Sequence, residues 1–205
     1  CTIENVPDDP TDRWMAELKG ILLQDDAEYT AYYPTSIFNS GTGILPSTQT
    51  YVGASPETLG GIYPMYGKGT VSVGLIRFHN ILGLLQIRMC SSDSNTYSVK
   101  SITVSDPEKG MCGAFTVDES DWTARLTNNT KIPVTLDCGG TEIIGTSITD
   151  FYIGIPAGTY NALTITVTTT DGNKTATCKV SVLLPEGALP GVFSVSDTKK
   201  VRFSK

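Results

Sequence analysis

Apolar and polar residues alternate over much of the chain between residues 73 and 184. Side chains of a β-strand point to opposite faces in turn, so this alternation predicts strands with one buried face. Turn-forming residues separate the segments, and the first segment contains a break near Asn80 and Gly83. Strands repeated at this spacing are typical of a Greek-key β-sandwich. Seven strands are predicted, over residues 73–89, 98–105, 112–118, 132–138, 149–156, 162–170 and 174–184.

The last two strands belong to one long predicted hairpin, TITVTTTDGNKTATCKVSVLL, over residues 164–184. Asp171-Gly172 provides its turn, because glycine adopts a positive φ without strain. One face of the hairpin is almost entirely threonine, serine and lysine, and the other face is apolar. We expect the apolar face to lie inward, with Ala176, Cys178, Val180 and Val182 on the second strand. The same alternation directs Phe151, Ile153 and Ile155 into the core.

The flanking segments lack this regularity. Residues 10–22 carry apolar side chains at helical spacing, which predicts a short helix, and residues 28–34 are a β-prone run. Residues 35–70 are rich in Gly, Ser, Thr and Pro, which predicts a long irregular crossing segment. Residues 185–191 resemble a linker, and residues 192–205 alternate like a strand. We expect that last strand to pair with a sheet edge of this chain or of a neighbour.

These observations divide the all-β chain into three parts. Residues 1–69 form an N-terminal segment without regular alternation. Residues 70–184 form the β-sandwich domain, and residues 185–205 form a linker and a C-terminal strand with which another domain could begin.

Composition and charge exclude two classes of function. The chain has 205 residues, of which 40% are hydrophobic and 18% are charged, and this balance is typical of a folded chain. It has 15 basic and 21 acidic residues, a net charge of −6 and no basic run. Nucleic-acid binding requires clustered Lys and Arg, so nucleic acid is not an expected partner. No run of 18 apolar residues occurs, so no membrane-spanning helix is predicted.

Candidate catalytic and metal-binding residues are few. None of the five cysteines stands in a C-x-x-C pair, and His79 is the only histidine, so no zinc site is predicted. Cys138 and Cys178 fall on inward strand positions, where we expect buried thiols. His79 has no G-x-S-x-G partner motif. We therefore predict no catalytic, cofactor-binding or metal-binding residue.

Two alternatives remain open on the residues alone. Paired carboxylates at Asp8-Asp9, Asp25-Asp26 and residues 118–121 are the only candidates for a secreted hydrolase, although aspartate is common in turns. A sugar-stacking platform of Trp122, Tyr152 and Tyr160 would indicate a glycan-binding module of a surface nutrient-capture system.

Several strand sequences also carry a family resemblance. FHNILGLLQIRM, VKSITVSDPEKGMCGAFTVD, PVTLDCGG, TDFYIGIPAGTY and LTITVTTTDGNK occur in this order, and YTAYYP precedes them. Together they resemble the fimbrillin-like proteins of Bacteroidales over about residues 28–184. The resemblance implies transthyretin-like β-sandwich domains, export as a lipoprotein, and a place on the outer surface of the cell. It also implies fimbrial or adhesive roles, and assembly by donation of a strand between neighbouring subunits.

The resemblance gives Cys1 two interpretations. Mature bacterial lipoproteins begin with a lipid-bearing cysteine, and the polar stretch CTIENVPDDP would serve as its tether. Cys1 could equally mark a chain boundary. The resemblance also implies an upstream sandwich domain, which is mostly missing before residue 35, so residues 1–69 would be either a remnant of that domain or a tether. Residues 191–205 depart from the family's tail, which puts polymerisation in doubt. We expect a non-enzymatic surface protein without cofactors, whose partners are neighbouring surface subunits, host molecules or glycans.

Overall fold

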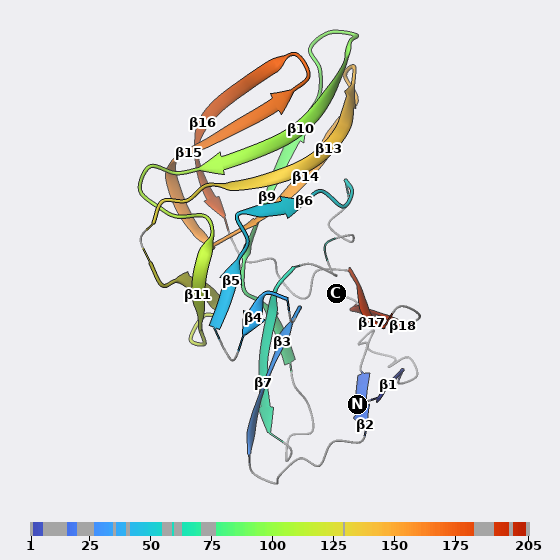
Figure 1. Cartoon of the computed structure of the whole chain (residues 1–205), viewed down its shortest axis with the longest axis vertical. Coiled ribbons are helices and arrows are strands. Elements are labelled where there is room, and N and C mark those ends of the chain that lie inside the picture. The colour runs from blue at the N-terminus through green and yellow to red at the C-terminus, as the bar shows by residue number, and fades with distance from the viewer. Residues whose placement is uncertain are drawn as a thin grey trace.

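The computed structural model describes residues 2–5, 16–19, 27–34, 36–39, 42–54, 59, 63–70, 77–128, 130–182, 191–196 and 199–203 of the 205-residue chain. These residues form eighteen β-strands in six sheets, and no α-helix occurs among them (Figure 1). The predicted all-β class is therefore confirmed. The same residues contain no helix that is long and apolar enough to cross a membrane.

The largest sheet contains, in spatial order, β16 (Gly172–Val182), β15 (Gly158–Thr169), β10 (Thr96–Ser105), β13 (Val134–Ile144) and β6 (Thr48–Thr50). Its neighbours run antiparallel, except that β13 and β6 are parallel. A second sheet of only two strands, β14 (Thr149–Ile155) and β9 (Gly83–Met89), packs against it. We call these seven strands the larger sandwich.

Alternating side chains build the core of the larger sandwich. Phe151, Ile153 and Ile155 of β14 are fully buried, as the sequence pattern predicts. They meet Ile102 and Leu136 from the opposing five-stranded sheet. Fully burying one such side chain contributes roughly 1.5–3 kcal/mol, so this core accounts for much of the stability of the fold.

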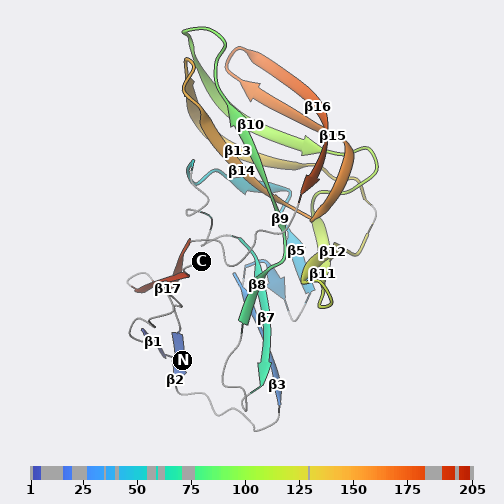
Figure 2. The same cartoon turned by 180° about the vertical axis from the view of Figure 1, so that it is seen from behind.

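A smaller two-sheet unit lies below the larger sandwich in both views (Figures 1 and 2). One sheet contains, in order, β12 (Thr123–Leu126), β11 (Gly113–Asp118), β5 (Thr42–Leu45) and β4 (Phe38–Asn39). The other contains β3 (Glu28–Tyr33), β7 (Met65–Thr70) and β8 (Arg77–Asn80). Phe38, Tyr66 and Phe115 belong to its separate hydrophobic core. We call these strands the smaller sandwich.

The terminal segments form two separate hairpins. β1 (Thr2–Asn5) pairs with β2 (Ala16–Lys19), and β17 (Gly191–Ser196) pairs with β18 (Lys199–Phe203). The helix predicted over residues 10–22 is wrong where the structure describes it, because residues 16–19 form a strand. The described C-terminal residues form two strands that pair with each other and not with another described sheet of this chain. Pairing with the sheet edge of a neighbouring molecule stays a prediction.

All seven predicted strands are present, and the break near Asn80 separates β8 from β9. The prediction for residues 35–70 is wrong, because four strands, β4 to β7, lie there. Two of these strands pair with partners that are distant in sequence: β5 pairs with β11, and β6 pairs with β13. β12 was not among the predicted strands. Strands from residues 1–69 thus share sheets with strands from residues 70–184.

Candidate functional site

His79, the only histidine, is packed against an aromatic ring. Its imidazole stacks on the indole of Trp122, with ring centres 4.1 Å apart and an angle of 7° between the planes. Tyr66 lies next to the same indole and donates a hydrogen bond from its hydroxyl to Glu119 Oε1 at 2.8 Å. Lys68 bridges Glu119 and Glu28. This cluster joins β3, β7, β8 and the β11–β12 turn.

The carboxylates of residues 118–121 cap a turn. Asp118 Oδ1 accepts hydrogen bonds from the backbone N–H and the hydroxyl of Ser120, and the hydroxyl is the larger cause that lowers the pKa of Asp118. Asp121 Oδ1 accepts from the backbone N–H of Thr123, and Arg125 contacts both aspartates. These contacts hold the turn in which Trp122 has a φ of 58°. Asp8-Asp9 and Asp25-Asp26 lie outside the described residues.

The three aromatic residues of the predicted sugar platform do not come together. Tyr160 is buried in the core of the larger sandwich, where its hydroxyl donates to Pro156 O and Lys109 Nζ lies 5.0 Å from its ring centre. Trp122 and Tyr152 pack against the core of the smaller sandwich instead. A platform that joins Trp122 to Tyr160 is therefore wrong.

The four described cysteines are free thiols, of which two are buried and two are exposed. Cys112 and Cys138 are buried free thiols, which confirms the prediction for Cys138. Burial, reinforced by the charge of Asp137, raises the pKa of Cys138 to about 12, so this thiol is not a nucleophile near neutral pH. Cys90 and Cys178 are exposed free thiols, and the prediction of a buried Cys178 is wrong. Cys1 lies outside the described residues.

The exposure of Cys178 reveals an uncovered apolar surface. Cys178 and Ala176 occupy inward positions of β16, opposite Leu163 and Ile165 of β15, yet both are exposed. Val182, at the other end of the strand, is only 3% exposed and lies against Gly83 of β9. The two-stranded sheet thus covers one end of β16 and leaves the other open. We call Ile165, Val167, Ala176, Cys178 and Val180 the hairpin inner face.

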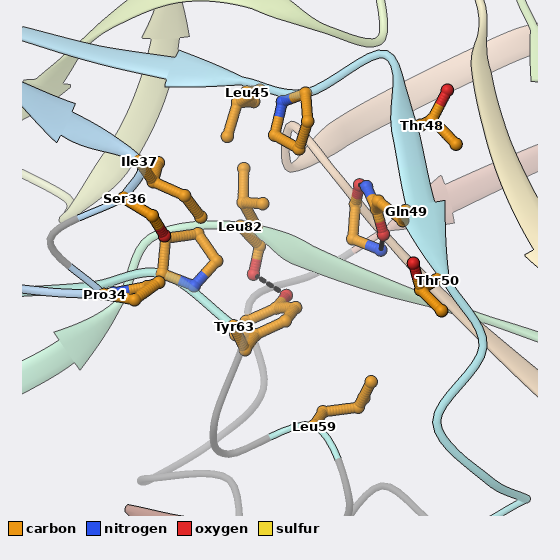
Figure 3. Close-up of a pocket in the computed structure, with 13 residues that line it drawn as sticks. Pro34, Ser36, Ile37, Leu45, Thr48, Gln49, Thr50, Leu59, Tyr63 and Leu82 are labelled. Atoms are coloured by element: carbon orange, nitrogen blue, oxygen red, sulfur yellow. Dashed lines mark hydrogen bonds between the residues drawn. The ribbon is translucent and has the colours of Figure 1, made fainter. Parts of the chain in front are cut away.

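A pocket of about 240 Å³ lies where the two sandwiches meet (Figure 3). Gln49 of β6 closes one side, because its amide donates to Gly154 O at 2.7 Å and accepts from Gly154 N at 3.0 Å. Tyr63 donates its hydroxyl to Leu82 O at 2.5 Å. None of the thirteen lining residues is charged, and they are Pro34, Ser36, Ile37, Leu45, Pro46, Thr48, Gln49, Thr50, Leu59, Tyr63, Pro64, Leu82 and Gly154.

Sequence reasoning missed this pocket. Most of its lining comes from the segment predicted to be irregular, and Pro34, Leu82 and Gly154 complete it. The Gln49–Gly154 contact joins residues 105 positions apart. The density of β-compatible residues between 42 and 50 is the one signal that could have indicated strands there. Within the described residues, no group of three or more His, Cys, Asp or Glu side chains could hold a metal ion.

Asp93, in the loop between β9 and β10, has a lowered side-chain pKa. Its carboxylate accepts hydrogen bonds from the Ser91 hydroxyl, the backbone N–H of Asn95 and the Tyr97 hydroxyl. These bonds, led by that of Ser91, lower its pKa to about 2. Because the folded-state pKa is depressed, the stabilisation is complete above the ordinary carboxyl pKa of about 4 and is lost as the pH falls towards 2.

We therefore predict that Asp93 stays ionised at pH 3. A carbon-13 NMR titration of its carboxyl group should give a midpoint near pH 2. Tyr97→Phe removes one donor and should raise that midpoint, whereas a wild-type midpoint near 4 would contradict the hydrogen-bonded loop.

No model of a known protein family matches the chain, and no curated protein matches its sequence. The fold is similar to the crystal structure of a candidate cell adhesion protein from Bacteroides ovatus, with a TM-score of 0.43 and 14% sequence identity. The match covers 83% of this chain and 66% of the other, a little under two thirds of that protein's length. A likeness at this level establishes neither a family nor a function.

Proposed function

We propose that this chain is a non-enzymatic cell-surface protein, a fimbrial subunit or adhesin-like module, that associates with neighbouring subunits by strand exchange. The hairpin inner face is the observation that carries the proposal. Ala176 and Cys178 are exposed although alternation places them toward the core. The other three side chains of this face are half-buried against the core. An exposed apolar sheet face of this kind favours a partner that covers it.

Unpaired strand edges lie beside that face. β16 is the last strand of its sheet, and β9 pairs only with β14 among the described residues. An incoming strand could therefore gain backbone hydrogen bonds from one edge while its alternate side chains cover Ala176 and Cys178. Lys174 and Lys179 on β16 would disfavour indiscriminate pairing, because charged side chains protect sheet edges.

A matched pair of substitutions tests strand exchange. Cys178→Arg places a charge on the hairpin inner face, and Thr177→Arg places the same charge on the outer face of the same strand. Both positions are exposed, so both variants should fold. We expect Cys178→Arg to reduce assembly at least tenfold, measured by light scattering of concentrated protein, because a buried unpaired charge is costly. Thr177→Arg should assemble like the wild type.

Thiol labelling provides a second measurement. Cys178 should lose maleimide reactivity when subunits assemble, while exposed Cys90 should keep it. A wild-type chain that stays monomeric at every concentration, or a Cys178→Arg variant that assembles normally, would reject strand exchange.

The surface location and the lipid anchor belong to the same proposal. Lipidation of Cys1 would place the chain at the outer membrane, and Cys1→Ser should then move it from the membrane fraction to the soluble fraction. The division into residues 1–69, 70–184 and 185–205 remains a prediction. The hydrolase and the glycan-binding module gain no support, since the described carboxylates cap turns and the predicted aromatic platform is divided between two cores.

A further inference from the structure

Strand β6 presents a free backbone edge. Thr135 N donates to Ser47 O at 2.8 Å, and Tyr51 N donates to Asp137 O at 2.8 Å, so residues 47, 49 and 51 direct their backbone groups toward β13. Backbone groups of successive strand residues point to opposite sides. Thr48 and Thr50 therefore direct their N–H and C=O groups away from β13, and no described strand pairs with β6 on that side.

The pocket opens beside this edge. Thr48 and Thr50 belong to its lining, together with the apolar side chains of Ile37, Leu59 and Leu82 (Figure 3). An apolar cavity of about 150 Å³ holds a benzene molecule, so about 240 Å³ accommodates one large aromatic or branched side chain. The edge and the pocket are thus close enough to contact the same extended segment.

Two polar side chains of the pocket, Gln49 and Tyr63, are already engaged. The Gln49 amide is bonded at both ends to Gly154, and the Tyr63 hydroxyl is bonded to Leu82 O. A charged group placed here would lose its hydration without finding a partner of opposite charge. The pocket therefore selects an uncharged apolar side chain.

We infer that β6 and this pocket bind an extended peptide segment of another protein. The segment pairs with the outward backbone groups of Thr48 and Thr50 and inserts one large apolar side chain into the pocket. In this mode of recognition, main-chain hydrogen bonds provide affinity and the pocket provides specificity. The net charge of −6 favours a segment with neutral or basic flanks. This edge is separate from β16 and β9, so the inference does not depend on strand exchange.

A random nine-residue peptide library displayed on phage is the first probe. Selection against the intact chain should enrich peptides that have one large apolar residue among β-forming residues and few acidic residues. Enrichment of no peptide, or of acidic peptides without an apolar anchor, would overturn the inference.

Backbone and pocket variants then locate the binding site with the best enriched peptide. Thr50→Pro removes the outward N–H, and proline is compatible with an edge position whose N–H faces away from the sheet. Thr50→Val keeps that N–H and is the matched control. We expect Thr50→Pro and Ile37→Asp each to weaken binding at least tenfold by calorimetry, and Thr50→Val to bind like the wild type.

Two further outcomes decide the inference. Binding that survives Thr50→Pro would exclude strand addition, even if Ile37→Asp abolished it. Cys178→Arg should leave peptide binding unchanged, so failure of strand exchange and failure of this site are distinguishable. Thermal unfolding of each variant checks that it has folded before its affinity is compared.

Discussion

Replacing Phe151 by alanine should lower the free energy of unfolding by about 3–5 kcal/mol, as is usual for a large-to-small change in a core. Phe151 is 0% exposed, and its ring centre lies 5.0 Å from that of Tyr51. Its strand, β14, is half of the two-stranded sheet that covers the five-stranded sheet. Few neighbouring strands can therefore collapse into the cavity that alanine leaves. Denaturant unfolding followed by circular dichroism measures the change.

Two comparisons make this result specific. Thr175→Ala, on the exposed outer face of β16, should change the free energy of unfolding by no more than about 0.5 kcal/mol. Phe151→Leu should fall between the two, because it fills part of the space. A Phe151→Ala protein as stable as the wild type would mean that this ring does not belong to the core.

The strands that the sequence predicts correctly share one property. Each has enough alternating residues to show which face is buried, as in Phe151, Ile153 and Ile155. The strands that it misses are short, such as β4 with two residues and β6 with three. β6 pairs with β13, which is distant in the chain, whereas β4 pairs with β5, which follows it directly. Two or three residues are too few to show which face of a strand is buried. The glycine and proline residues of the surrounding segment, residues 35–70, favour irregular structure when they are considered alone.

Cys178 shows a second limit of local reasoning. Alternation places it correctly on the inward face of β16. Whether an inward face is buried depends on the opposite sheet, which has two strands against five. No pattern within residues 172–182 carries that information. The exposure of the hairpin inner face is therefore a property of the two sheets together and not of the β16 sequence.

The pocket also depends on contacts that the local sequence does not indicate, here between residues that are distant in the chain. Gln49 and Gly154 are ordinary strand residues in the sequence, and only the fold brings the amide to the backbone of the other strand. The absence of a side chain at Gly154 lets the Tyr63 ring pack closely against this backbone, since a Cβ there would lie 3.1 Å from the ring. The residues of the proposed peptide site therefore form no recognisable sequence motif, and only the fold brings them together.

Gly43→Ala should destabilise the chain by about 3 kcal/mol, which is at the upper end of the usual cost of overpacking. Gly43 is buried in β5 and lies opposite Phe115 of β11 on one side and Phe38 of β4 on the other. A Cβ added at Gly43 would overlap the ring of Phe115, which is 0% exposed. The Phe115 ring also meets Phe38, with ring centres 5.5 Å apart, so it has little freedom to move away.

A double-mutant cycle separates this clash from other effects of the added methyl group. Phe115→Leu removes the part of the ring that would overlap, so the double variant should be more stable than the sum of the two single changes predicts, by about 1–2 kcal/mol. Gly145→Ala is the contrasting control, because its φ of 51° is left-handed and nothing lies within 4 Å of an added Cβ. Its cost should come from the backbone alone and remain the same when Phe115→Leu is present. Strict additivity between Gly43→Ala and Phe115→Leu would show that the Phe115 ring does not cover Gly43.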